Sequence, residues 1–212
     1  MESKLNNEKQ ITERIIDELV EERNYINSQK ESYREQNEKF GNKMLGNAIA
    51  NILRRHIENI INYYGLDYSV SSGNDFIEGI PTEWDLIIYK KGTSVQNGII
   101  KPENASVVIE FKTSGNVDTK YKQHSKTEFL KEQYDKKFEY IKCKNNRIKF
   151  AYISFSMVED WYNATKEYFD NMNGIKNTVF AFLEDKALDK GNIIAIDDCN
   201  DFESYILNLL EK

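Results

Sequence analysis

The segment "VVIEFKTSG", residues 107–115, ends an apolar run with a carboxylate and an ammonium group two positions apart. Side chains at positions i and i+2 of a strand point to the same face of the sheet. Glu110 and Lys112 are therefore expected to project together, while Phe111 faces the opposite side. The spacing indicates a pair of opposite charges at the end of a buried strand.

A second carboxylate, Asp85, lies within the apolar segment "TEWDLIIYK", residues 82–90. A charged side chain inside such a strand needs a partner. If the two strands are neighbours, Asp85 lies opposite Glu110, and the two carboxylates repel each other. A divalent cation removes this repulsion, and carboxylate oxygens suit Mg²⁺. We therefore predict carboxylate oxygens about 4–5 Å apart, close enough to share one ion.

Lys112 would then stand beside the cation, where its ammonium group orients a water molecule or helps to deprotonate it. This arrangement hydrolyses phosphodiesters, because the cation activates water and neutralises the charge that develops during the reaction. A simpler alternative is that Glu110 and Lys112 form only a surface ion pair and Asp85 caps a turn.

Hydrophobic periodicity predicts the elements that must hold these residues. A polar helix over residues 8–40 carries one stripe of apolar side chains: Ile16, Leu19, Ile26, Tyr33 and Phe40. A second helix over residues 43–64 has one wide apolar face and is closed by Gly65. The other expected elements are a short strand and turn at 66–76, strands at 80–92, 105–113, 147–156, 177–185 and 192–197, and helices at 126–143, 159–174 and 201–212.

The core order is therefore helix, three strands, helix and strand, which indicates an α/β sheet flanked by helices. Two of the first three strands are joined closely enough to be antiparallel, whereas the fourth follows a helix and should pair in parallel. We divide the chain into an N-terminal helical arm, residues 1–40, and an α/β domain, residues 41–212.

Asp85 followed by Glu110-Phe111-Lys112 resembles the D…(E/D)xK signature of the PD-(D/E)XK superfamily, the restriction-endonuclease-like nucleases. The resemblance covers residues 43–156 and implies that family's α-β-β-β-α-β core with a mixed central sheet. It implies that Asp85 and Glu110 are metal ligands, that Lys112 is the catalytic lysine and that the backbone carbonyl of Phe111 is a further ligand.

Two features depart from the pattern of that family. Many members carry a glutamate on the first core helix; here that helix offers Glu58 near its end, while the earlier Asn47 is not a carboxylate. Glu58 is therefore the candidate for a further metal ligand. Pro81 precedes Asp85 by four residues, so the literal Pro-Asp pair is absent.

Charge is distributed unevenly along the chain, whose formal net charge is −6. Residues 112–149 hold 11 Lys and Arg against 5 Asp and Glu, whereas residues 150–212 hold 5 against 12. A locally basic segment can attract a polyanion despite an acidic total. The candidate substrate-binding side chains in it are Lys120, Lys122, His124 and Lys126.

Several function classes are disfavoured by composition. The chain has only two histidines, and no Walker A, Rossmann glycine or CxxC pattern is present. No apolar run approaches the ~18 residues of a membrane span, and no secretory signal is visible at the N-terminus. Cys143 and Cys199 are expected to be thiols in the reducing cytoplasm.

These patterns predict a nuclease dependent on Mg²⁺ or Mn²⁺ that hydrolyses phosphodiester bonds of DNA, most simply a restriction or defence endonuclease. The polar helix over residues 8–40 is expected to form a homodimer, because cleavage of two strands needs two active sites. The alternative is a catalytically inactive nuclease-fold protein that binds DNA or a partner protein.

Overall fold

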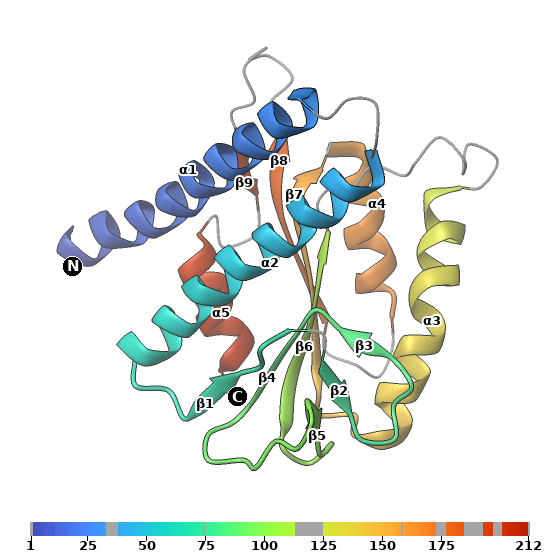
Figure 1. Ribbon diagram of the computed structural model, residues 1–212. Coiled ribbons are helices and arrows are strands. Elements are labelled where there is room, and N and C mark those ends of the chain that lie inside the picture. Colours follow the sequence, from blue (N-terminus) through green and yellow to red (C-terminus); the bar gives the residue numbers. More distant parts are fainter. Residues whose placement is uncertain are drawn as a thin grey trace.

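The computed structural model describes residues 2–32, 38–73, 75–112, 125–157, 159–172, 177–184, 193–196 and 201–211. Five helices and nine strands lie in this part of the chain (Figure 1). The helices are α1 (Glu2–Ser32), α2 (Glu38–Tyr63), α3 (Lys126–Lys144), α4 (Glu159–Asp170) and α5 (Phe202–Leu210). The strands are β1 (Tyr68–Val70), β2 (Asp75–Ile77), β3 (Glu83–Trp84), β4 (Leu86–Lys90), β5 (Ile99–Ile100), β6 (Ala105–Lys112), β7 (Lys149–Met157), β8 (Asn177–Glu184) and β9 (Ile193–Ile196).

Six strands form one mixed sheet in the order β1-β4-β6-β7-β8-β9. β1, β4 and β6 are antiparallel neighbours, β7 and β8 continue in parallel with β6, and β9 is antiparallel to β8. When only the strands of this sheet are counted, the segment from α2 to β7 reads α2-β1-β4-β6-α3-β7, which is the α-β-β-β-α-β order expected from the sequence. The predicted fold class, an α/β core with a mixed central sheet flanked by helices, is confirmed.

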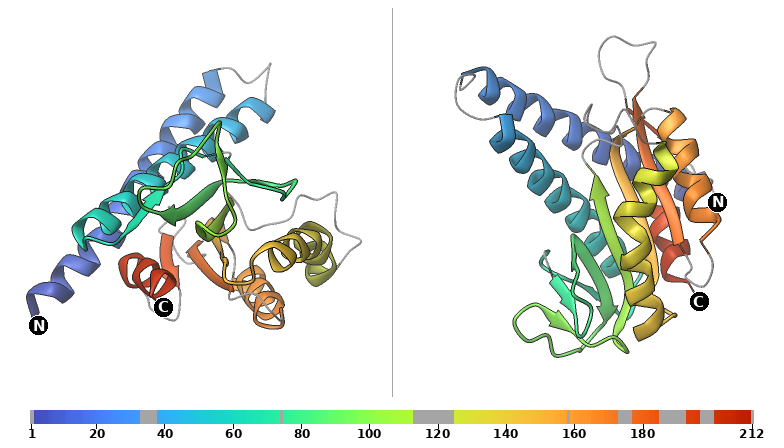
Figure 2. Two further views of the ribbon diagram at one scale, coloured as in Figure 1. Left: turned by 90° about the horizontal axis from the view of Figure 1, so that it is seen from below. Right: turned by 90° about the vertical axis from the view of Figure 1, so that its right-hand side faces the viewer.

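The sheet separates two apolar cores (Figure 2). On one face, α1, α2 and α5 pack against the alternate β6 residues Val107, Ile109 and Phe111. On the other face, α3, α4 and a small sheet of order β3-β2-β5 pack against Val108 and its neighbours. Because side chains alternate along a strand, Glu110 shares the α3 face with Val108.

The segment expected to form one strand over residues 80–92 is instead divided at Asp85. Trp84 is fully buried in the core beneath α3, and β3 pairs with β2 of the small sheet. From Leu86 onward the chain belongs to the large sheet as β4. The expectation that Asp85 lies inside a continuous strand is therefore wrong: Asp85 lies where the chain passes from one sheet to the other.

The predicted single helix over residues 8–40 is also wrong, because α1 ends at Ser32 and α2 already begins at Glu38. Ile15 and Leu19 of α1 are fully buried in the core that α2 and α5 share, and Ile26 is buried too. The side chains of Tyr33 and Phe40 lie outside the described residues. Since the described stripe is buried within the same chain, it supplies no reason for a second copy. The division of the chain at residue 40 stays a prediction.

A buried hydrogen-bond network fastens α1 to α5. Thr12 Oγ1 donates to Asp201 Oδ1 at 2.6 Å and accepts the amide proton of Phe202 at 3.0 Å. Asp201 is the N-cap of α5, and its Oδ2 accepts from the amide of Ser204 at 2.7 Å. One hydroxyl thus joins the first helix to the N-terminus of the last.

None of the helices in the described ranges is both long and apolar enough to cross a bilayer.

Replacing this hydroxyl by a methyl group should destabilise the protein. Thr12→Val keeps the side-chain shape but leaves the buried Phe202 amide without its acceptor, which costs about 1–3 kcal/mol. Urea unfolding measures the loss, and the exposed Thr127→Val is the matched control. The loss should not depend on protein concentration, because the contact lies within one chain; a loss that vanishes on dilution would contradict this packing of α1.

Candidate functional site

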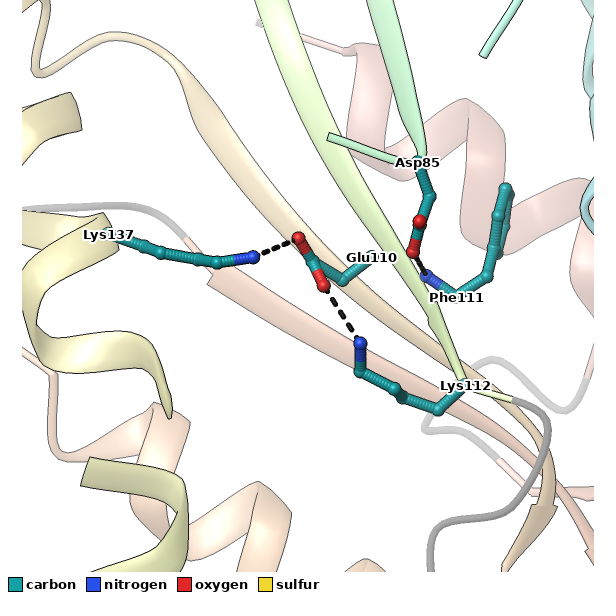
Figure 3. Close-up of polar contacts among 5 residues, drawn as sticks. All are labelled: Asp85, Glu110, Phe111, Lys112 and Lys137. Atoms are coloured by element: carbon teal, nitrogen blue, oxygen red, sulfur yellow. Dashed lines mark hydrogen bonds and ion pairs between the residues drawn. The ribbon is translucent and has the colours of Figure 1, made fainter. Parts of the chain in front are cut away.

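Glu110 is a buried carboxylate held by two ammonium groups. It is 4% exposed and lies near the end of β6, on the face that α3 covers. Lys112 Nζ donates to its Oε2 at 2.9 Å, and Lys137 Nζ, from α3, donates to its Oε1 at 2.5 Å. Figure 3 shows the two ammonium groups approaching the two carboxylate oxygens from different elements. The shared face expected of Glu110 and Lys112 is thus present as a direct ion pair.

Asp85 accepts a hydrogen bond from the backbone of β6. Its Oδ2 lies 2.7 Å from the amide nitrogen of Phe111 (Figure 3). At the N-terminal end of β4, pairing with β6 stops at Leu86 and Ile109. The Asp85 carboxylate adds one more hydrogen bond beyond this point. The bond fixes the Asp85 carboxylate beside the strand that carries Glu110.

The electrostatic environment of Asp85 opposes its ionisation. Burial, and after it the negative charge of Glu110, raise the pKa of Asp85 above its usual value. The hydrogen bond from Phe111 and the charges of Lys112 and Lys137 act in the opposite direction but are smaller. The two carboxylates therefore interact, as expected for acidic groups that a cation could bridge.

Asp85 directly precedes β4, and Glu110 lies on β6, the neighbour of β4 in the large sheet. Leu86 pairs with Ile109, so Asp85 and Glu110 are the next residues in register. In Figure 3 the Asp85 carboxylate points to the Phe111 amide, while the Glu110 carboxylate points to Lys112 and Lys137. The adjacency expected from the sequence is present. A shared ion with the predicted oxygen spacing stays a prediction.

Lys137 is a component of this cluster that the sequence patterns did not single out. Its ammonium group lies 5.0 Å from the ring centroid of Trp84 and 5.8 Å from that of Tyr134. α3 begins with a capping box at Ser125, and its buried face includes Tyr134. Lys137 follows Tyr134 by three positions, so it lies on nearly the same helix face. That spacing was the one available signal for a lysine aimed at the sheet.

A polar cavity of about 390 Å³ opens beside Asp85 on the α2 side of the sheet. α2 lines it with Asn47, Asn51 and Arg54, and Asp85 and Phe111 form part of the opposite wall. Through this cavity, Asp85 can be reached from outside the protein.

Glu58 does not join the two carboxylates in the described part of the chain. Its carboxylate pairs with Arg54 Nη1 at 3.2 Å, one turn away on α2. No group of three or more His, Cys, Asp or Glu side chains converges on a metal position among the described residues. The first core helix therefore offers amides and a guanidinium group near Asp85, where the resemblance led us to look for a carboxylate.

The donor set nevertheless fits Mg²⁺. This ion is usually held by one or two carboxylates, and its other positions are filled by water and substrate phosphate oxygens. Asp85, just before β4, and Glu110, on the neighbouring β6, supply two carboxylates. The backbone carbonyl of Phe111 stays a predicted ligand. The charges of the cluster, two carboxylates and two ammonium groups, sum to zero.

Of the predicted substrate-binding residues, only Lys126 lies in the described part of the chain. It begins α3, and its ammonium group lies 5.3 Å from the ring centroid of Trp161. Lys120, Lys122 and His124 lie outside the described residues. Cys143 is a free, exposed cysteine, and Cys199 lies outside the described residues as well.

Comparison with known proteins supports the fold assignment. No protein-family model matches the chain, and no curated protein matches it. Among solved structures, the chain is similar to NucC from P. aeruginosa ATCC27853 in its cAAA-bound form, with a TM-score of 0.54 and 10% sequence identity. The alignment covers 95% of this chain and 88% of the NucC chain. The chain therefore shares its fold, a mixed sheet flanked by helices, with this NucC structure.

Neutralising the two carboxylates should change stability in opposite directions. Asp85→Asn keeps an oxygen for the Phe111 amide and removes a buried charge, so the free energy of unfolding should stay equal or rise by up to about 1 kcal/mol. Glu110→Gln removes two charge-assisted hydrogen bonds, so stability should fall by about 1–3 kcal/mol. Urea unfolding without divalent cations at pH 7 measures both. Asp67→Asn, at an exposed position, is the control for replacing a carboxylate by an amide. If Asp85→Asn lowered the free energy of unfolding as much as Glu110→Gln does, this electrostatic description would be contradicted.

The raised pKa of Asp85 also predicts how stability depends on pH. The folded state binds this proton more tightly than the unfolded chain, so the stability from this group is present at low pH and is lost as the pH rises through the raised pKa. Asp85→Asn does not titrate at this position. The stability advantage of Asp85→Asn over the wild type should therefore be largest near neutral pH and shrink as the pH falls through the raised pKa toward the usual aspartate value. Urea unfolding at a series of pH values measures the difference in free energy of unfolding between the two proteins. If the advantage of Asp85→Asn grew as the pH fell, the prediction would be wrong in sign.

Proposed function

We propose that this protein is a divalent-cation-dependent nuclease that hydrolyses phosphodiester bonds of DNA at the cluster of Asp85, Glu110 and Lys112. The observation that carries the proposal is the position of Asp85 beside β6, whose residues Glu110 and Lys112 form an ion pair, in a chain that shares the fold of NucC. The carboxylates come from β6 and from the residue before β4, and the ammonium group lies two residues beyond Glu110. The residues that carry the resemblance to the PD-(D/E)XK nucleases are those of this cluster, whereas the first-helix carboxylate and the literal Pro-Asp pair have no counterpart in it.

The chain's own residues have distinct roles in this proposal. Asp85 and Glu110 hold Mg²⁺ or Mn²⁺, together with the carbonyl of Phe111. The cation supplies positive charge to the scissile phosphate and lowers the pKa of a water molecule. Lys112 orients the attacking water and counters the negative charge that builds up on the phosphate. The hydrogen bond from Phe111 keeps the Asp85 carboxylate beside β6, the strand that carries Glu110, and in the wall of the cavity.

DNA is the proposed substrate because polar and basic groups surround the cluster. Arg54, Asn47 and Asn51 line the cavity next to Asp85 and are suited to phosphate and sugar oxygens. Lys126, with Lys120, Lys122 and His124, is proposed to contact phosphates farther along the strand. The setting that best suits such an enzyme is restriction or another defence function in the cytoplasm, with a homodimer cutting both strands.

One observation favours the alternative of an inactive nuclease-fold protein that binds DNA or another protein. Both oxygens of Glu110 are engaged by lysine ammonium groups. A cation can enter this cluster only if one of these bonds is exchanged. The cleavage assay that follows separates the two functions.

Incubation of the protein with plasmid DNA and Mg²⁺ should yield nicked and linear products. Lys112→Ala should reduce the rate by at least about 100-fold, because it removes the group that positions the nucleophile. Asp85→Asn and Glu110→Gln should do the same and should also weaken Mg²⁺ binding, measured by calorimetry. Lys136→Ala, at an exposed lysine of α3, is the control. Full activity of Lys112→Ala at saturating Mg²⁺ would reject the proposed role of this lysine.

A further inference from the structure

Lys137 is the one lysine that reaches the cluster from outside the two strands, among the described residues. We propose that Lys137 is a cation-dependent DNA contact: a divalent cation displaces its ammonium group from Glu110, and the released ammonium group then binds a phosphate of the DNA. This inference rests on the proposed nuclease function and deepens it. It assigns a substrate-binding role to a residue that no sequence pattern had marked.

The first argument is the charge of the cluster. Glu110 is 4% exposed, and its two oxygens are bonded to Lys112 and Lys137. Together with Asp85 this arrangement is neutral, so a divalent cation would add two positive charges in a buried place. Like charges at such distances repel strongly where water is scarce. Displacement of one ammonium group from the Glu110 carboxylate relieves this repulsion when the cation binds.

The second argument identifies which ammonium group leaves. Lys112 is fixed to the same strand two residues from Glu110 and is needed beside the cation in the proposed reaction. Lys137 approaches from α3 instead, and its ammonium group already lies near the rings of Trp84 and Tyr134, at 5.0 and 5.8 Å. Aromatic faces stabilise a cation by about 0.5–2 kcal/mol. These rings can hold the ammonium group near the cluster after it leaves the Glu110 oxygen.

The third argument concerns what the released group meets. The side chain of Lys137 is 25% exposed, so part of it reaches the surface without a rearrangement of α3. A phosphate that contacts a cation held by Asp85 and Glu110 must lie within a few ångströms of Glu110. The free ammonium group and the phosphate would then be neighbours of opposite charge. In this proposal the ammonium group of Lys137 pairs with Glu110 when the cation is absent and with a DNA phosphate when the cation is bound.

The test compares the wild type, Lys137→Met and the control Lys136→Met, whose exposed lysine lies one residue away on α3. Fluorescence anisotropy with a short DNA duplex measures affinity and its dependence on salt, first in EDTA and then in Ca²⁺. In Ca²⁺, Lys137→Met should bind DNA roughly 3–10-fold more weakly, with a salt slope smaller by about one. In EDTA, Lys137→Met and the wild type should bind alike, because Lys137 is then held by Glu110.

A second measurement needs no DNA. Calorimetric titration should show Mg²⁺ binding roughly 3–10-fold more tightly to Lys137→Met than to the wild type, because a competing cation has been removed. Lys136→Met should match the wild type in both experiments. Lys137→Gln, which keeps hydrogen-bonding capacity without charge, should behave like Lys137→Met and serves if the methionine variant does not fold.

The outcomes separate this inference from the function on which it rests. A wild-type protein that binds neither Mg²⁺ nor DNA overturns the proposed function and the inference together. A wild type that binds both, with Mg²⁺ affinity and salt slope unchanged in Lys137→Met and Lys137→Gln, overturns the inference alone. A loss of DNA affinity of equal size in EDTA and in Ca²⁺ also overturns it, because Lys137 would then be an ordinary basic contact.

Discussion

The burial of one carboxylate, that of Glu110, constrains the architecture around it. A negative charge at 4% exposure is tolerated only when it is paired, because an isolated buried carboxylate is strongly destabilising. One partner, Lys112, comes from the same strand. The other, Lys137, must come from a separate element, so α3 has to cross the sheet at this level. The packing of Tyr134 and Phe138 against Phe150 of β7 holds it there.

Asp85 meets a different constraint at the junction of the two sheets. Trp84 is drawn into the core beneath α3, while Leu86 enters the core beneath α2. The residue between them cannot continue either ladder with its backbone. Its side chain instead accepts a hydrogen bond from the Phe111 amide. This bond extends the pairing of β4 with β6 and places a carboxylate beside the strand that carries Glu110.

The sequence predicted those parts of the site that depend on local periodicity. The i, i+2 spacing of Glu110 and Lys112 predicted that their side chains share a face. The apolar runs that contain Asp85 and Glu110 predicted two neighbouring strands. The bend at Asp85 was missed, because it depends on which of two cores takes Trp84. Lys137 was missed because a lysine on an amphipathic helix usually faces solvent, and only the crossing of α3 over β6 directs it inward. The boundary between α1 and α2 was misplaced, because a polar segment with one apolar stripe is compatible with one long helix or with two.

The attachment of α1 to α5 has a consequence for how the chain is made. Thr12 and Asp201 are 189 positions apart, yet they share a buried hydrogen bond. During synthesis from the N-terminus, α2 is available to pack against Ile15 and Leu19 early, but the α5 side of their core is missing until residues 202–210 have left the ribosome. For that interval the part of the apolar core that α5 covers lies open, and such surface is the kind that chaperones bind and that aggregates when unprotected. The strands and the helix that carry the acidic cluster are complete before that point, so the nascent chain can form its site before α1 is fastened to α5.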